Sequence, residues 1–361
     1  MTESRFIPNS YDDLPTSGKS SWRSPSNIAL VKYWGKRENQ IPANPSISFT
    51  LNSCFTTTLV SYEKLKEKQH QFSFDFLFEG SPKEEFKPKI QTFLSRIEVY
   101  LPFLKEYHLV IESSNSFPHS SGIASSASGM SALALCLMDI EKELNPTVTP
   151  NFFNQKASFL ARLGSGSACR SIQGPLVQWG SYKGIENSSD FYGVTYPFKT
   201  HAVFQDFCDT VLLVDKGEKT VSSTVGHGLM HHHPFAEQRF QQAHTNLDTL
   251  KAIFRSGDLD GFIQVVESEA LTLHAMMMTS TPYFILMKPN TLQIINKIWA
   301  FRRETKSHVC FTLDAGSNVH VLYPAAEKTV VLKFIKEELA SHCQNGQFIE
   351  DQVGTGAIKL V

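Results

Sequence analysis

The segment PHSSGIASSASG is rich in glycine and serine and lies between an apolar run, HLVIESS, and an amphipathic stretch. The apolar run predicts a strand, and apolar residues that recur every three or four positions from Ala127 to Met138 predict a helix. Backbone N–H groups at such a junction can surround a polyphosphate. The segment is therefore a candidate nucleotide loop. It contains no Lys and is not a Walker loop, so an ordinary capped helix is the alternative.

A second loop of small residues, GSGSACRS, follows residues 151–163, which predict a helix. Ser165, Gly166 and Ser167 can donate hydrogen bonds to an anion. Arg170 adds a planar fork of donors that matches a carboxylate or a phosphate. A tight turn without a ligand is the alternative explanation of the same residues.

Basic residues flank two aromatic ones in the segment NIALVKYWGKR. If the chain is extended there, Lys32 and Lys36 lie on one face of a strand. Together with Arg37, and beside Tyr33 and Trp34, they could present cations to a multiply charged ligand. A solvated surface strand is the alternative.

Asp314 ends the apolar pattern HVCFTLD and precedes the turn AGSN. A carboxylate at the end of a strand can be fixed so that it faces a cleft. Capping of the turn is the more ordinary role of an Asp at such a position.

Four histidines are crowded in VGHGLMHHHPF, namely His227 and the run 231–233. Neighbouring histidines cannot all face one ion, and no acidic partner lies at a helical offset, so the segment is a weak candidate for a metal site. Solvated surface side chains are the default interpretation.

Strands and helices alternate along the chain, which predicts an α+β protein. Strands are expected within 24–59 and in HQFSFDFLFEG, HLVIESS, GPLVQWGSY, DTVLLVD, HVCFTLD and VHVLYP. TVVLKFIKEELASH is expected to begin as a strand and to continue as a helix. Further helices are expected over 87–101, 235–255, 259–278 and 289–306. Residues 1–23 are expected to be a loose leader, followed by domains at 24–200 and 201–361.

The composition predicts a compact globular protein, because 41% of the 361 residues are hydrophobic and 19% are charged. Lys and Arg number 34 against 35 Asp and Glu, so the charge of −1 gives no bulk attraction to nucleic acid or to an anionic membrane. No apolar run approaches the roughly 20 residues that span a bilayer. The six cysteines are scattered, as is typical of reduced thiols, and the expected location is cytoplasmic.

Read together and in order, NIALVKYWGKR, IPANPSISFTL, FPHSSGIASSASG, GSGSACRS, TVSSTVG and LDAGSN resemble the mevalonate diphosphate decarboxylase family of the GHMP small-molecule kinase superfamily. The resemblance runs from about residue 24 to residue 323. It implies a two-domain GHMP kinase-like fold with the active site in the interdomain cleft. The expected activity is ATP-dependent conversion of mevalonate 5-diphosphate to isopentenyl diphosphate, and family members are commonly homodimers.

The resemblance also implies roles for individual residues. Asp314 is expected to be the catalytic carboxylate, Lys32 to keep it ionised, and Arg170 to hold the substrate carboxylate. ATP and Mg²⁺ are the expected cofactors, with Ser128 as the metal ligand. The expected substrate-binding residues are Asn27, Tyr33, Lys36, Ser165, Gly166, Ser167, Ser222 and Ser223. The expected ATP-binding residues are Ser121, Gly122, Ile123, Ala124, Ser125, Ser126 and Ser128.

Three segments depart from the family pattern: Ser317 replaces a Pro, His119, Ser120 and Ser121 stand where Thr and Ala are common, and His227 replaces a Met. None of these changes removes an expected catalytic group. A related decarboxylase of a monophosphate substrate, a kinase that stops at the phosphorylated intermediate and a catalytically silent nucleotide-binding regulator remain alternatives. The sequence does not decide between a diphosphate and a monophosphate substrate.

Overall fold

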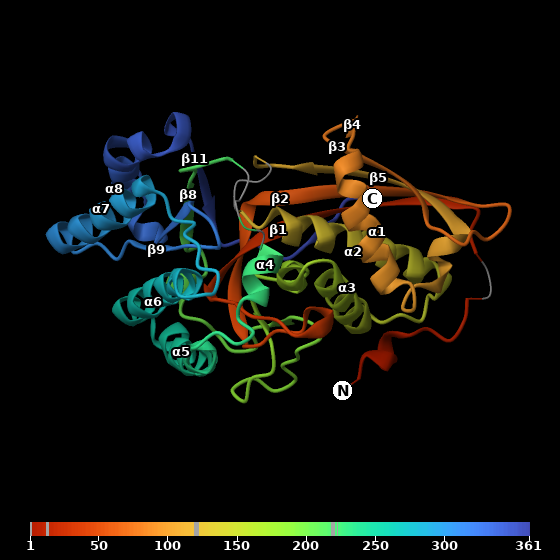
Figure 1. Ribbon diagram of the computed structural model, residues 1–361, viewed down its shortest axis with the longest axis horizontal. Helices are drawn as coiled ribbons and strands as arrows, with labels where there is room; N and C mark the ends of the chain where they lie inside the picture. Colours follow the sequence, from red (N-terminus) through yellow and green to blue (C-terminus); the bar gives the residue numbers. More distant parts are fainter. Residues whose placement is uncertain (1, 12–13, 119–122, 218–220, 222) are drawn as a thin grey trace.

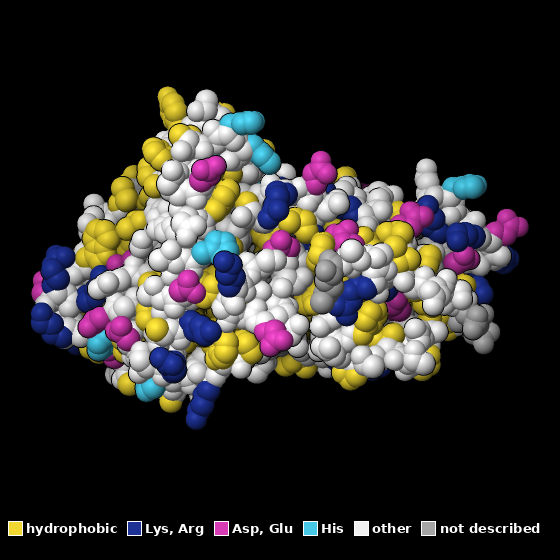
Figure 2. Space-filling model, turned by 90° about the horizontal axis from the view of Figure 1, so that it is seen from below, with side chains coloured by type: hydrophobic (Ala, Val, Ile, Leu, Met, Phe, Trp, Pro, Cys, Tyr) yellow, Lys and Arg dark blue, Asp and Glu magenta, His cyan; other side chains and the backbone are white. Residues whose placement is uncertain are grey.

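The computed structural model describes residues 2–11, 14–118, 123–217, 221 and 223–361. The strands of these residues form two sheets. Figure 1 shows two lobes side by side: a larger one, in which α1, α2 and α3 lie along one side of the large sheet, and a smaller one with α7 and α8. On the face shown in Figure 2, basic and acidic side chains are interspersed, in keeping with the net charge of −1.

The large sheet has the strand order β12-β1-β2-β5-β3-β4, and β6 extends from β2 with β7 beside it. Strands β1, β2 and β5 are antiparallel to one another, whereas β3 runs parallel to β5. Register shifts in the β1–β2 pair lie shortly before the residues where β1 ends. The strands are β1 (Ser17–Val31), β2 (Ser46–Lys64), β3 (Ser73–Phe78), β4 (Ser81–Pro82), β5 (Tyr107–Asn115), β6 (Leu176–Trp179), β7 (Val194–Thr195) and β12 (Ile358–Lys359).

Three helices cover this sheet: α1 (Lys87–Ile97), α2 (Ser125–Leu144) and α3 (Pro150–Gly164). Most of α2 is buried, because it lies between the sheet and α3 and its apolar residues face both. Thr149 caps α3 by accepting a hydrogen bond from the backbone N–H of Phe152 at 3.3 Å. These helices confirm the expected periodicity after Ser125 and over 151–163.

The small sheet has the order β11-β8-β10-β9 and is antiparallel throughout. Asp258 starts α6 by accepting a hydrogen bond from the backbone N–H of Gly261 at 3.0 Å. The strands are β8 (Cys208–Leu212), β9 (Cys310–Thr312), β10 (Val319–Tyr323) and β11 (Phe348–Gln352). The helices are α4 (Ser223–Gly228), α5 (Ala236–Ser256), α6 (Leu259–Met278), α7 (Pro289–Thr305) and α8 (Lys328–Phe334).

Short helical turns join these elements. One of them, η5 (Gly166–Ser171), contains most of the second small-residue loop. The other 3₁₀ turns are Glu3–Phe6, Glu38–Gln40, Glu84–Phe86, Pro102–Glu106, Ala202–Phe204, Ala325–Glu327, Ala340–His342 and Gln344–Gly346, and Ile335–Leu339 is a π turn.

A hydrophobic core joins the two lobes. Apolar residues near the end of β1 and the start of β2 pack against phenylalanines of α5, α6 and the segment before β8. The ring centres of Phe254 and Phe262 lie 6.3 and 6.5 Å from the ring centre of Phe49 on β2. Packing of this kind fixes the point at which β1 leaves the sheet.

The expected loose leader is wrong for much of its length. Strand β1 begins at Ser17, and Phe6 is 1% exposed. Its ring stacks on Phe159 with 4.5 Å between the ring centres. The first residues therefore add to the hydrophobic core of the large lobe rather than preceding it.

The expected strand at the start of TVVLKFIKEELASH is also wrong, because this segment is helical from Lys328 onwards. Val331, Phe334, Ile335 and Leu339 are buried at helical spacing. Packing of this face outweighs the strand preference of the paired valines. The division of the chain near residue 200 stays a prediction, and the C-terminal strand β12 pairs with β1 of the first sheet.

Candidate active site

Lys32 and Asp314 form an ion pair where the two lobes meet. Lys32 follows the last residue of β1, and Asp314 lies two residues beyond β9. The Nζ atom of Lys32 lies 3.0 Å from Oδ1 of Asp314. The lysine side chain is 2% exposed and the aspartate side chain 29%. Burial lowers the pKa of Lys32, and the charge of Asp314 opposes that shift. The pair thus combines a sealed cation with an accessible carboxylate.

Arg170 is a buried cation beside this pair. It is 3% exposed, its Nε donates to Oδ1 of Asn27 at 3.3 Å, and its Nη1 donates to the hydroxyl of Ser46. The guanidinium also lies 5.8 Å from the ring centre of Trp179. Within the described ranges, no carboxylate lies at ion-pair distance from Arg170. A buried guanidinium without a carboxylate partner is well suited to bind an anionic ligand.

Asn27 holds the η5 turn in place. Its Nδ2 donates to Oγ of Ser171 at 2.8 Å and to the backbone oxygen of Ser167 at 3.2 Å, while its oxygen accepts the bond from Arg170. Asn27 therefore positions Arg170 and the loop that carries it. The expected direct contact of Asn27 with a substrate stays a prediction.

Gly166 lies at a point where no side chain fits. A Cβ atom there would lie 2.9 Å from the hydroxyl of Tyr33 and 3.1 Å from the ring of Trp179. The Tyr33 hydroxyl is itself buried and has no hydrogen-bond partner among the described residues. An orphaned buried hydroxyl is costly, and a polar ligand in this site would satisfy it.

The two small-residue loops meet at a pair of serines. The hydroxyl oxygens of Ser126, in the first turn of α2, and Ser165, at the end of α3, are 3.3 Å apart. Both residues are partly exposed, as is Ser167. The expected phosphate loop and the expected substrate loop are therefore adjacent in space.

Lys36 does not share a strand face with Lys32. Strand β1 ends at Val31, and Gly35 turns the backbone with a φ of 96°. Lys36 is partly exposed, and its Nζ lies 3.0 Å from Oε1 of Gln40. The expectation that the two lysines share one face of a strand is therefore wrong.

His227 is buried in the site, which corrects the surface interpretation. Its ring centre lies 4.2 Å from that of Tyr33 and 4.6 Å from that of Trp34. Nδ1 accepts a hydrogen bond from the backbone N–H of Gly35 at 3.0 Å. Burial, with the nearby charges of Lys36 and Arg170, lowers the pKa of His227 to about 3. His227 is therefore neutral at physiological pH.

The other members of the histidine cluster do not form a metal site. His233 is buried and lies 3.0 Å from the backbone oxygen of Met276, whereas His231 and His232 are exposed. In the part of the chain that the structure describes, no group of three His, Cys, Asp or Glu side chains could hold a metal ion.

The expected phosphate loop is described from Ile123 onwards, and Ser121 and Gly122 lie outside the described residues. Ile123 is buried, whereas Ser125 and Ser126 are partly exposed in the first turn of α2. Ala124 precedes the helix in the left-handed region with a φ of 47° and provides no side-chain cap. The backbone oxygen of Ala124 accepts hydrogen bonds from the N–H groups of Ala127 and Ser128. The N–H groups of Ser125 and Ser126 have no capping side chain, which favours an anion there.

Ser128 does not fit its expected role as a metal ligand. Its side chain is 0% exposed, and its hydroxyl lies 2.6 Å from Oγ1 of Thr56 on β2. The hydroxyl also donates to the backbone oxygen of Ser125 at 3.3 Å. Helical geometry turns Ser128 toward the sheet, and the partly exposed hydroxyls are those of Ser125 and Ser126.

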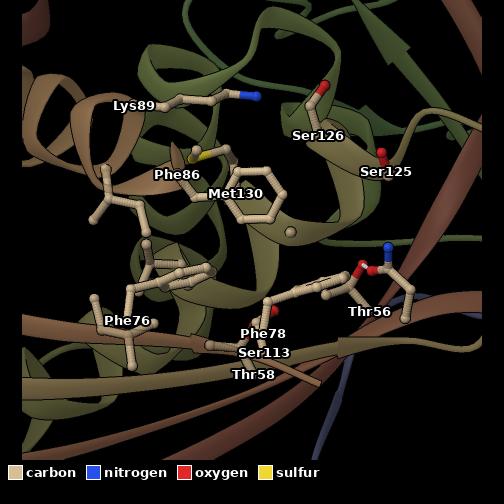
Figure 3. A pocket seen from close by; sticks show the side chains of 15 residues that line it. Thr56, Thr58, Phe76, Phe78, Phe86, Lys89, Ser113, Ser125, Ser126 and Met130 are labelled. Atoms are coloured by element: carbon tan, nitrogen blue, oxygen red, sulfur yellow. Dashed lines mark hydrogen bonds between the residues drawn. The ribbon is translucent and has the colours of Figure 1, made fainter. Parts of the chain in front are cut away.

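A pocket lies beside the first turn of α2, between α1 and the sheet strands β2, β3 and β5 (Figure 3). Its volume of about 170 Å³ is smaller than the roughly 300 Å³ of a small site for a whole drug-sized ligand. It can therefore hold only part of a nucleotide. Its lining residues include Thr56, Thr58, Phe76, Phe78, Phe86, Lys89, Ser113, Asn115, Ser125, Ser126 and Met130.

The sequence interpretation missed this pocket. Alternation in SFDFLF predicted that Phe76 and Phe78 share a face of a strand, but not which helix would lie opposite. Ser46, which binds Arg170, was missed as well. From the second lobe, Ser222 lies outside the described residues, and Ser223 begins α4, which lies between the lobes in Figure 1.

Comparisons with known proteins agree over both lobes. The family described as diphosphomevalonate decarboxylase-like N-terminal domain matches residues 24–190. The family described as mevalonate 5-diphosphate decarboxylase C-terminal domain matches residues 210–358. The diphosphomevalonate decarboxylase of Saccharomyces cerevisiae is 30% identical over 334 residues, which cover 88% of this chain and 80% of the relative.

Two solved structures are similar over nearly the whole chain. One is described as "MDDEF in complex with MVAPP, AMPPCP and Magnesium", with a TM-score of 0.81, 27% identity, and coverage of 95% of this chain and 99% of that chain. The other is a mevalonate diphosphate decarboxylase from Legionella pneumophila, with a TM-score of 0.76 and 31% identity. The match covers 92% of this chain and 100% of that chain. None of the described helices is long and apolar enough to cross a membrane.

Proposed function

Since this chain belongs to the diphosphomevalonate decarboxylase family, we propose that it converts mevalonate 5-diphosphate to isopentenyl diphosphate in an ATP-dependent reaction. Carbon dioxide, ADP and phosphate are the other products. The observation that carries the proposal is the Lys32–Asp314 pair beside Arg170, a buried cation without a carboxylate partner among the described residues. Such a site combines a carboxylate that can accept a proton with a cation that can bind the carboxylate of a substrate.

The first step transfers the terminal phosphate of ATP to the tertiary hydroxyl of the substrate. A tertiary hydroxyl is a poor nucleophile, so it must be aligned with the phosphate. The accessible carboxylate of Asp314 accepts or orients its proton. Lys32 keeps Asp314 ionised and neutralises charge on the phosphoryl group as it moves.

The second step expels the new phosphate together with carbon dioxide. As the phosphate leaves, positive charge develops on the tertiary carbon. The electron pair of the carboxyl–carbon bond then forms the double bond. Arg170 holds the carboxylate in the required orientation, and Asn27 and Ser46 hold Arg170. The burial of Arg170 strengthens this interaction because water is excluded.

Hydrogen-bond donors of the protein surround the proposed position of the substrate diphosphate on several sides. We propose that Lys36, the hydroxyl of Tyr33 and the hydroxyls of Ser165 and Ser167 contact it, with Ser222 and Ser223 contributing from the second lobe. The buried and orphaned Tyr33 hydroxyl supports a polar ligand at this position. A monophosphate substrate would use fewer of these donors, which the assay below tests.

ATP is proposed to bind along the first turn of α2. Its base would enter the pocket of Figure 3, where Phe78 and Met130 supply apolar surface and Lys89 a cation. Its phosphates would meet the N–H groups of α2, with Ser121, Gly122, Ile123 and Ala124 before them. The structure described as containing AMPPCP and magnesium supports this nucleotide.

The described residues fit a magnesium ion that arrives with ATP. They hold no cluster of three ligands, and Mg²⁺ in such sites is bound mainly by phosphates and water. The hydroxyls of Ser125 and Ser126 would complete its shell. When bound, magnesium neutralises charge on the transferred phosphate.

We also propose that the protein is a cytoplasmic homodimer. Its six cysteines are buried free thiols, as is usual in a reducing compartment. The dimer follows from the family resemblance. Analytical ultracentrifugation tests it directly, and a monomer at micromolar concentration would contradict it.

A coupled assay with ATP, magnesium and mevalonate 5-diphosphate tests the function. We expect ADP and carbon dioxide in equal amounts. ADP without carbon dioxide would indicate a kinase that stops at the phosphorylated intermediate. Neither product, followed by turnover of the monophosphate, would indicate the related decarboxylase. Nucleotide binding without any turnover would indicate a regulator.

A further inference from the structure

The backbone of Lys32 is held by side chains from several elements. Strand β1 ends one residue earlier, so the backbone groups of Lys32 need other partners. The backbone N–H donates to Oε2 of Glu269 on α6 at 2.9 Å. The backbone oxygen accepts from Nη2 of Arg239 on α5 at 3.0 Å and from Nδ2 of Asn44 at 2.9 Å.

Glu269 and Arg239 form a fully buried ion pair. Nη1 and Nη2 of Arg239 each donate to one oxygen of Glu269, at 3.0 and 2.5 Å, and both side chains are 0% exposed. Nδ2 of Asn246 donates to Glu269 at 2.6 Å. A buried ion pair is weak evidence for stability, because apolar residues of similar volume often serve as well. Its contacts with Lys32 point to another role.

Helix α6 contacts the backbones of both members of the Lys32–Asp314 pair. Glu269 binds the N–H of Lys32, and Nε2 of His274, five residues further along, lies 3.2 Å from the backbone oxygen of Asp314. The two reacting side chains thus start from backbone positions fixed against one rigid helix. A shared support of this kind holds the two backbones in a fixed relation, and the side chains that they carry meet at 3.0 Å between Nζ and Oδ1.

We propose that Glu269, with Arg239, is a positioning residue for the reaction, which holds the backbone of Lys32. This inference rests on the proposed function. The other charged or titratable groups near Lys32 are Asp314 and Arg170, with Asp209 and His320 in the small sheet. Glu269 and Asp314 raise the pKa of Lys32 against the larger opposing effect of burial.

Because Glu269 is charged, its replacement should change the pH dependence of kcat, which a loss of packing alone would not change. Lys32 must be protonated to act, so activity falls as pH rises through its pKa. Replacing Glu269 with Gln removes a charge that favours the ammonium form, and the alkaline limb of the kcat profile must therefore move to lower pH.

The test compares Glu269→Gln with a control on the same helix, Glu267→Gln. Glu267 bonds Arg302 and Trp299 of α7. We expect Glu269→Gln to lower kcat on the order of 10- to 100-fold, with KM for ATP within about twofold, and to shift the alkaline limb. Glu267→Gln should leave the alkaline limb in place. An unchanged kcat and limb in Glu269→Gln would overturn the inference.

A second variant keeps the test valid if Glu269→Gln does not fold. Glu269→Asp retains the charge but is shorter by one methylene group. It should lower kcat while the alkaline limb stays where it is, and an unchanged kcat would again overturn the inference. If the wild-type enzyme released neither ADP nor carbon dioxide, the proposed function would fail instead.

Discussion

Among the described residues, two lysine–carboxylate pairs bury the lysine almost completely, and they differ in the exposure of the carboxylate. Lys156 and Glu141 are 1% and 3% exposed, and both lie on helices of the large lobe, α3 and α2. Lys32 is buried to a similar degree, but its partner Asp314 is 29% exposed and comes from the other lobe. An ammonium group and a carboxylate thus form a fully buried pair, Lys156–Glu141, and a partly exposed pair, Lys32–Asp314. We call the first the closed pair and the second the open pair.

In the proposed mechanism, exposure of the carboxylate distinguishes the reactive pair from the structural one. The Glu141 oxygen that binds Lys156 also accepts a bond from the Tyr11 hydroxyl at 2.9 Å, so the protein itself occupies it from two sides. Burial raises the pKa of Glu141 and lowers that of Lys156. The side chain of Asp314 is instead 29% exposed, so solvent or a substrate can reach it.

Replacing Asp314 with Asn should give the largest effect. The amide keeps the shape but cannot accept the proton, so kcat should fall about 1,000-fold or more, or roughly 4 kcal/mol. ATP binding, measured by calorimetry with a non-hydrolysable analogue, should change less than about threefold. Near-normal turnover would remove Asp314 from the mechanism and end the distinction between the pairs.

Replacing Lys156 with Met should affect stability and spare the chemistry. Removal of one partner leaves the other carboxylate buried and unpaired, at a cost of about 3 kcal/mol in the free energy of unfolding. Urea denaturation measures this, and kcat per folded molecule should stay within about twofold. The double variant with Glu141→Leu should recover part of the loss. A matching fall in kcat would show that the closed pair also serves catalysis.

Replacing Arg170 with Lys tests the cation beside the open pair. Lysine keeps the charge but loses the planar fork and its bonds to Asn27 and Ser46, so kcat/KM should fall about 50-fold, or roughly 2 kcal/mol. The ratio of carbon dioxide to ADP should fall below one, because the carboxylate is poorly held. An unchanged ratio would place Arg170 in binding rather than in decarboxylation.

Replacing His227 with Met should give the smallest effect, and only in acid. The folded pKa of about 3 lies below the ordinary 6.5, so the unfolded state binds more protons between these values and stability falls as pH falls. The contribution is up to about 2 kcal/mol between pH 8 and pH 5. The His227→Met variant should lack this part of the loss in thermal unfolding. Identical pH slopes would contradict a neutral buried histidine.

Much of the fold could be predicted from local pattern. The helix after Ser125 and the helix over 259–278 were expected, because long amphipathic periods specify a helix without reference to its partners. Helix α8 was missed because its valines favour a strand locally and only packing makes them helical. Strand β12 has two residues, too few for any period to show.

The candidate site, too, could be predicted only in part from the sequence. Asp314, Lys32 and Arg170 could be expected because they lie in recognisable segments, and the structure brings them together. Glu269 could not, since it is one of several acidic residues on its helix, and only the position of α6 against Lys32 distinguishes it from Glu267. Ser128 was misassigned because a sequence does not show which face of a first helical turn meets the sheet.

The pairing of residues 351–359 with the first sheet has a consequence for biosynthesis. Strand β12 covers the edge of β1, and Asp351 accepts hydrogen bonds from the backbone N–H groups of Asn52, Ser53 and Cys54. A ribosome makes these partners only after most of the second lobe. The large lobe can begin to fold early, but this part of the β1 edge stays open to pairing with other chains until residues 351–359 have been made. The lobe that is synthesised first is therefore completed after the second lobe has been made.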